Sequence, residues 1–95
     1  MATNDILSNP PAFKGIGNGT TSGAELTLPA EGNNFILYTG HNSYADVVSL
    51  WALRVSGNLA VHLGGGTNLT VTVSGRTVTV TTGRGSVTVS VLRIG

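Results

Sequence analysis

The last third of the chain alternates apolar and hydroxyl-bearing residues with a period of two. Val or Leu occupies every second position through residues 69–73, 78–80 and 87–91, and Thr or Ser fills the positions between them. Turns centred on Gly75 and on residues 83–85 separate the three runs. This alternation predicts half-buried strands, and the glycine-containing turns predict that the three strands form an antiparallel meander.

Shorter apolar segments precede this region. Residues 25–28 predict a short strand that ends at Pro29, and residues 35–39 predict a strand that is apolar on both faces. Residues 58–63 predict a further strand, which ends at the run of glycines at 64–66. We therefore predict an all-β protein, an antiparallel β-sandwich (jelly-roll-like or meander) of about six to eight strands.

The alternating apolar positions are predicted to line the interior of the sandwich, because successive side chains of a strand point to opposite faces. The predicted interior positions are Leu37, Val61, Leu69, Val71, Val73, Val78, Val80, Val87, Val89 and Val91. His62 lies between two apolar positions of its strand, so it is predicted to face outward.

The segment from residue 47 to 55 admits two interpretations. As a strand it is apolar on both faces, with Val47 and Trp51 on the same side. As a helix it would begin at Ser43 as N-cap, with Asp46 completing a pair that resembles a capping box. We favour the strand, because its neighbours are β and because β-branched and aromatic residues dominate it.

The first 24 residues differ from the rest of the chain. They contain two consecutive prolines and a segment, residues 14–19, in which every second residue is glycine. Such a composition disfavours both helix and strand. The predicted organisation is an extended N-terminal arm or linker over residues 1–24 and a β-sandwich domain over residues 25–95.

Composition and charge exclude several classes of protein. Only 9% of the 95 residues are charged, against about 25% in an ordinary soluble domain. The net charge is +1 and the few cations are scattered, so we expect no nucleic-acid partner. The chain has no cysteine, which excludes disulfides and thiolate metal sites. It also has no apolar run long enough for a membrane helix and no recognisable signal peptide, so no membrane insertion is expected.

Self-association is predicted from the strands with two apolar faces. In a two-sheet sandwich only the inner face of a strand needs to be apolar, so a second apolar face needs a cover. The cover is the N-terminal arm, a ligand or another subunit. A domain this small also gains stability from partner subunits, and we expect a homo-oligomer, of which a homotrimer is the favoured form.

Catalytic machinery is not apparent in the sequence. The carboxylates Asp5, Glu25, Glu31 and Asp46 are dispersed and form no acid/base pair, and neither histidine lies in a metal-ligand pattern. We therefore expect neither enzymatic activity nor a cofactor.

The loop from residue 39 to 46 is the most chemically varied stretch. It combines an imidazole, an amide, a phenol and a carboxylate, carried by His41, Asn42, Tyr44 and Asp46. Aromatic rings beside hydrogen-bonding groups are typical of sugar sites, so these four residues are the candidate binding residues for a cell-surface glycan. The alternative is that they only shape a turn and cap the core.

The region from residue 35 to 95 resembles the terminal domains of bacteriophage tail fibres and related receptor-binding proteins. The resemblance lies in the Tyr38–His41 stretch, the Asp46–Arg54 stretch, the glycine run at 64–66 and the closing Thr/Val alternation. It implies a homotrimeric β-sandwich on a virion, or in an extracellular setting, that contacts host glycans. Two further functions stay open: a free-standing, lectin-like carbohydrate-binding domain, and a purely structural capsid decoration or trimerisation domain.

Overall fold

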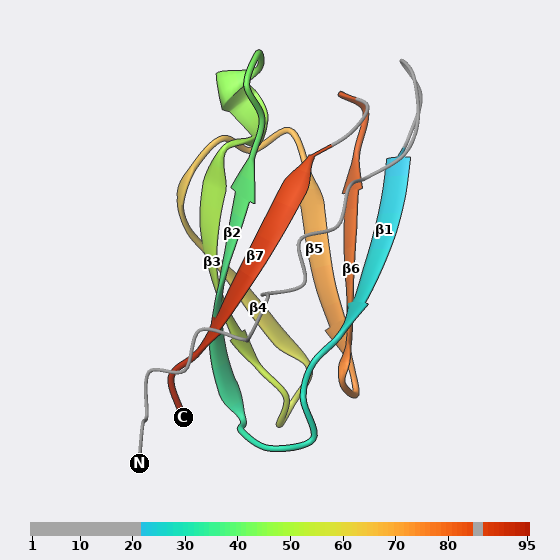
Figure 1. Ribbon diagram of the computed structural model, residues 1–95, viewed down its shortest axis with the longest axis vertical. Coiled ribbons are helices and arrows are strands. Elements are labelled where there is room, and N and C mark those ends of the chain that lie inside the picture. Colours follow the sequence, from blue (N-terminus) through green and yellow to red (C-terminus); the bar gives the residue numbers. More distant parts are fainter. Residues whose placement is uncertain (1–21, 85–86) are drawn as a thin grey trace.

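The computed structural model describes residues 22–84 and 87–95, in which seven strands and one 3-10 turn alternate with short loops (Figure 1). The elements are β1 (Ser22–Thr27), β2 (Asn34–Gly40), η1 (Ala45–Val47), β3 (Ser49–Arg54), β4 (Leu59–Gly65), β5 (Thr70–Ser74), β6 (Thr77–Thr82) and β7 (Thr88–Arg93).

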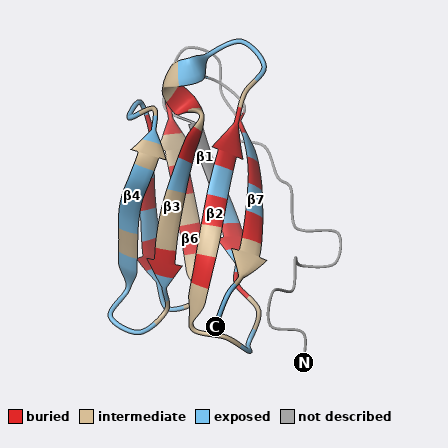
Figure 2. Cartoon of the chain, turned by 90° about the vertical axis from the view of Figure 1, so that its left-hand side faces the viewer, coloured by how far each residue is buried: buried red, intermediate tan, exposed pale blue. Residues whose placement is uncertain are grey.

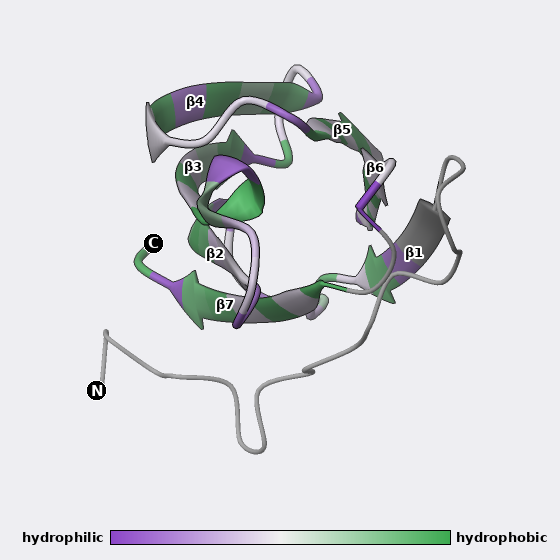
Figure 3. Cartoon of the chain, turned by 90° about the horizontal axis from the view of Figure 1, so that it is seen from above, coloured by the Kyte–Doolittle hydropathy of each residue, from purple (hydrophilic) through white to green (hydrophobic). Residues whose placement is uncertain are grey.

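The strands form two antiparallel sheets. One sheet has three strands in the order β1-β6-β5, and the other has four in the order β4-β3-β2-β7. Figure 2 looks onto the four-stranded sheet, and Figure 3 shows from above that the two sheets face each other across the core. The predicted all-β sandwich is confirmed.

The predicted meander of the last three strands is wrong. Strands β5 and β6 form the expected hairpin, and Gly75 supplies the positive φ of 60° that its turn needs. The other edge of β6 is already occupied by β1, with Leu26 opposite Val78. Strand β7 therefore crosses to the second sheet, where Val91 pairs with Leu37 of β2.

The core lies between the sheets and contains every predicted interior residue except Val61. It also contains apolar residues that the alternation did not single out. These are Leu26, Leu28, Phe35, Val47 and Leu53. Phe35 is fully buried and is the largest of the fully buried side chains, so the strand that is apolar on both faces supplies the centre of the core.

The strand interpretation of the segment from residue 47 to 55 is confirmed for Ser49–Arg54, which is β3. The helical alternative is limited to the single 3-10 turn Ala45–Val47. Its N-cap is Tyr44, not Ser43, and no side chain caps it.

The predicted interior position of Val61 in β4 is wrong, whereas His62 is exposed, as the sequence predicts. The strand register places Val61 opposite Ala52 and His62 opposite Trp51. Val61 therefore faces outward and is 41% exposed, while the His62 ring meets the Trp51 ring edge-on with centroids 5.0 Å apart. The pairing with β3 sets which face each side chain takes, and a shift of one residue inverts the whole strand.

The first strand begins at Ser22, so the sheet includes the residues from 22 to 24 that the sequence placed in the arm. The remainder of the predicted arm, residues 1–21, lies outside the described residues. Within the described ranges, no helix has the length and apolar character that crossing a membrane requires.

Candidate functional site

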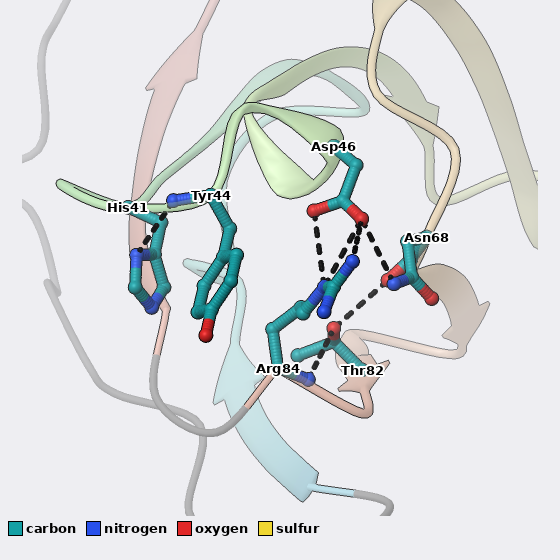
Figure 4. A network of polar contacts seen from close by, with 6 residues as sticks. All are labelled: His41, Tyr44, Asp46, Asn68, Thr82 and Arg84. Carbon is teal, nitrogen blue, oxygen red and sulfur yellow. Dashed lines mark hydrogen bonds and ion pairs between the residues drawn. The ribbon is translucent and has the colours of Figure 1, made fainter. Parts of the chain in front are cut away.

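Three connections meet at one end of the sandwich, at the top of Figure 1. They are the loop from β2 to β3, which contains η1, the connection from β4 to β5, and the segment that follows β6. Figure 4 shows the polar contacts that join them. We refer to His41, Tyr44, Asp46, Asn68 and Arg84 together as the loop-end cluster.

An ion pair between residues 38 positions apart lies at the centre of this cluster. The Arg84 guanidinium donates from Nη2 to Asp46 Oδ2 at 2.6 Å and from Nε to the same oxygen at 3.0 Å. These hydrogen bonds from Arg84 lower the pKa of Asp46 below its ordinary value of 3.8, and the hydrogen bond with Asp46 raises the pKa of Arg84. Both side chains are about 40% exposed, so the pair orients the loops and adds little stability by itself.

Asn68 ties the β4–β5 connection to the same carboxylate. Its side-chain amide donates to Asp46 Oδ2 at 3.1 Å, and its backbone N–H donates to the Asp46 carbonyl at 2.9 Å. Its own carbonyl accepts a hydrogen bond from the Thr82 hydroxyl at 2.8 Å, and that hydroxyl oxygen accepts from the Arg84 N–H at 3.2 Å. The three connections are thus cross-linked by hydrogen bonds (Figure 4).

Two aromatic rings extend the cluster toward solvent. The Arg84 guanidinium carbon lies 4.5 Å from the centroid of the Tyr44 ring, within range of a cation–π contact. The His41 and Tyr44 rings meet edge-on, with centroids 5.0 Å apart. Tyr44 therefore lies between a cation and an imidazole while remaining 44% exposed.

His41 and Asn42 shape the turn before η1. His41 Nδ1 accepts hydrogen bonds from the backbone N–H groups of Ser43 at 2.9 Å and Tyr44 at 3.3 Å, which requires that this nitrogen carry no proton. Asn42 is exposed, and its side-chain oxygen accepts a hydrogen bond from the Ser43 hydroxyl at 3.4 Å. Asn42 makes no contact with the other candidate residues among the described interactions.

A buried chain of hydrogen bonds holds η1 on the four-stranded sheet. Trp51 Nε1 donates to Ser49 Oγ at 2.8 Å, and Ser49 Oγ lies 2.6 Å from Thr39 Oγ1. Thr39 Oγ1 donates in turn to the Val47 carbonyl at 2.6 Å. Since Thr39 has a single hydroxyl proton, Ser49 donates to Thr39. Thr39 is fully buried, so this chain fixes the loop from beneath.

The glycine run packs against the same loop. The backbone N–H of Gly66 donates to the Val48 carbonyl at 2.7 Å, and a Cβ atom on Gly66 would collide with the backbone of Asp46. Strand β4 itself continues through Gly65, past the end that the sequence predicted. The glycines therefore allow two backbones to approach closely, which a side chain would prevent.

A shallow depression of about 250 Å³ lies beside the cluster. Its lining is mainly polar and comes from the β5 and β6 ends and their connections: Thr67, Asn68, Leu69, Thr70, Thr81, Thr82 and Gly83. Asn68 belongs to both the depression and the loop-end cluster, whereas His41 and Tyr44 do not line the depression.

The structure brings together three of the four candidate residues, His41, Tyr44 and Asp46. The sequence analysis missed Arg84 and Asn68, which come from other loops and carry no local signal. The carboxylate of Asp46 is engaged with these two residues. Among the described residues no group of histidine and acidic side chains could hold a metal ion.

Comparisons with known protein families, with curated proteins and with solved structures found no match to this chain.

Proposed function

We propose that the chain is a non-catalytic adhesion module that binds an uncharged glycan at its loop end. The observation that carries the proposal is the hydroxyl- and amide-lined depression of about 250 Å³ beside the loop-end cluster, to which the exposed Tyr44 ring belongs. Hydroxyl and amide groups match the hydrogen-bonding groups of a sugar, and an aromatic ring matches its apolar face.

The charges of the site favour a neutral ligand. Arg84 and Asp46 are paired with each other at 2.6 Å, so a bound anion or cation would have to break an existing ion pair. A sugar without charged groups can bind while the ion pair between Arg84 and Asp46 stays intact. Binding is therefore expected to change little with salt concentration.

Binding to each site is expected to be weak. The depression is shallow, and deep enclosure of the ligand is what gives small-molecule sites their affinity. Useful adhesion then depends on several copies acting together. This agrees with the resemblance to tail-fibre terminal domains, in which the module would be displayed on a virion or another multivalent particle.

The test is a glycan array probed with the full chain displayed multivalently. Wild type is expected to bind a subset of neutral glycans. Thr70 and Thr81 lie opposite each other in the β5–β6 register and both line the depression, so the double variant Thr70→Val/Thr81→Val is expected to lose that binding. Tyr44→Ala is expected to weaken it.

Thr72→Val is the matched control. Thr72 lies on the same face of β5 as Thr70 but outside the depression, so its replacement is expected to leave binding unchanged. The proposal fails if multivalent wild type binds no glycan, or if the Thr70→Val/Thr81→Val variant binds as well as wild type.

A further inference from the structure

The outer faces of the two sheets have opposite chemistry. On β5 and β6 of the three-stranded sheet, the residues that alternate with the buried valines are all Thr or Ser. On the four-stranded sheet, the outward positions form a continuous apolar row across all four strands. Successive register partners in this row are Leu92, Ile36, Ala52 and Val61.

A second row lies next to the first. Tyr38 is opposite Leu50 on β3 and opposite Ser90 on β7. Tyr38 and Leu50 are 47% and 40% exposed. We refer to Ile36, Tyr38, Leu50, Ala52, Val61 and Leu92 together as the outer patch, which lies on the sheet that faces the viewer in Figure 2.

The surface of the patch is a ridge between two hollows. Tyr38 borders both of them. One hollow, of about 270 Å³, lies between Tyr38, Leu50 and Gly64, and the other, of about 240 Å³, lies between Tyr38, Ile36 and Leu92. A Cβ atom on Gly64 would meet no other atom within 4 Å, so the first hollow is open above this glycine.

No charged side chain interrupts the two rows of the patch; Arg54, opposite Leu59, lies beyond the row of Val61. A solvated sheet face ordinarily carries charged or polar residues that discourage association. Strand β4 is also oriented so that Val61 and Leu59 face outward. This orientation exposes the Val61 and Leu59 side chains to water unless another surface covers them.

We propose that the outer patch is the contact between two copies of this chain, packed sheet to sheet about a two-fold axis. A partner that binds through charge–charge interactions would need charged residues on the patch, and the patch has none. A second copy supplies an equally neutral, apolar surface. In the proposed contact the Tyr38 ring of each copy enters the hollow above Gly64 of the other, and this seating is reciprocal, as a two-fold contact requires.

The size of the patch sets the strength of the contact. Four strands about 4.8 Å apart and six residues long at about 3.3 Å each give the whole outer face of the sheet a footprint of roughly 400 Å², and the patch is the apolar part of this face. Two copies together bury at most roughly 800 Å² by this measure, which is below the usual size of specific interfaces and in the range of weak, transient contacts. Association is therefore expected to be weak, with a dissociation constant of micromolar or above, and at high local concentration it would bring two loop ends into one particle.

The first test is the mass of the full chain by sedimentation across micromolar concentrations. Wild type is expected to move from the 9.7 kDa chain mass to twice that mass as concentration rises. Val61→Lys places like charges on facing surfaces and is expected to raise the dissociation constant by at least about tenfold. Thr72→Lys is the matched control, since it adds the same charge at an exposed position of the other sheet, and it is expected to dimerise like wild type.

The Gly64→Phe substitution distinguishes a specific contact, in which Tyr38 enters the hollow, from non-specific hydrophobic association. This substitution fills the hollow that receives Tyr38 while adding apolar surface. If association is non-specific, the Gly64→Phe variant will associate more strongly than wild type. If Tyr38 enters the hollow, the variant will associate more weakly. Circular dichroism melts of each variant check that the sandwich remains folded.

Several results would overturn the proposal. A wild-type monomer at every concentration would mean that the rest of the chain, or a different partner, covers the patch. A trimer, the state expected from the sequence, would exclude the two-fold arrangement. Dimerisation by folded Val61→Lys as strong as that of wild type would place the contact on another surface, and stronger dimerisation by Gly64→Phe would exclude the seating of Tyr38. None of these results depends on glycan binding.

Discussion

Replacing Thr39 by Val tests whether the buried hydrogen bonds hold the loop end in place. Valine has nearly the same shape as threonine but cannot donate to the Val47 carbonyl or accept from the Ser49 hydroxyl. Thr39 and Val47 are both fully buried, so water cannot replace the lost hydroxyl without a local rearrangement.

The expected cost follows from these contacts. A buried carbonyl left without its donor costs about 1–3 kcal/mol. The additional buried methyl group of valine returns up to about 0.8 kcal/mol. The net destabilisation is therefore about 1–2 kcal/mol, which lowers the midpoint of thermal unfolding by roughly 5–15 °C in a domain of this size.

Thermal and urea unfolding of wild type, Thr39→Val and Thr72→Val measure this difference. Thr72→Val makes the same chemical change at an exposed position and is expected to shift stability by less than about 0.5 kcal/mol. If Thr39→Val is as stable as wild type, the hydrogen-bond chain beneath η1 does not contribute to folding and does not hold the loop in position.

Two further predictions concern the loop end. Gly66→Ala is expected to destabilise the protein by about 1–3 kcal/mol in urea unfolding, because the new Cβ atom would collide with the Asp46 backbone. Gly64→Ala is expected to be close to neutral, because the space around its Cβ atom is open. Equal stabilities of the two variants would contradict the close approach of Gly66 to Asp46. The pKa of Asp46 is lowered in the folded state, so its contribution to stability is complete above its ordinary value of 3.8 and is lost as the pH falls through the lower folded value. The difference in melting temperature between wild type and Asp46→Asn should therefore shrink as the pH falls below about 4, and a difference that is constant with pH would exclude the ion pair with Arg84 as its source.

The sequence by itself determined the strands and most of the core. The alternation of Val with Thr has a period of two, which only an extended strand can satisfy with one buried face. The glycine at position 75 fixed one hairpin, because its positive φ is a local requirement of the turn. These features depend on neighbours in the chain, and they are correct at Val71, Val80 and Val89, which are all buried.

Only the tertiary structure decided which strands pair and which residues meet at the loop end. Strand β7 has the same Thr/Val pattern as β5 and β6, so the pattern alone predicts that β7 pairs with β6. In the structure, that edge of β6 is paired with β1. The register of β4 with β3 sets the side on which Val61 lies. The sequence alone predicts that an apolar residue of β4 such as Val61 faces the interior. Arg84 and Asp46 meet because two sheets place distant loops at one end of the sandwich, and a contact across 38 positions leaves no trace in the local pattern.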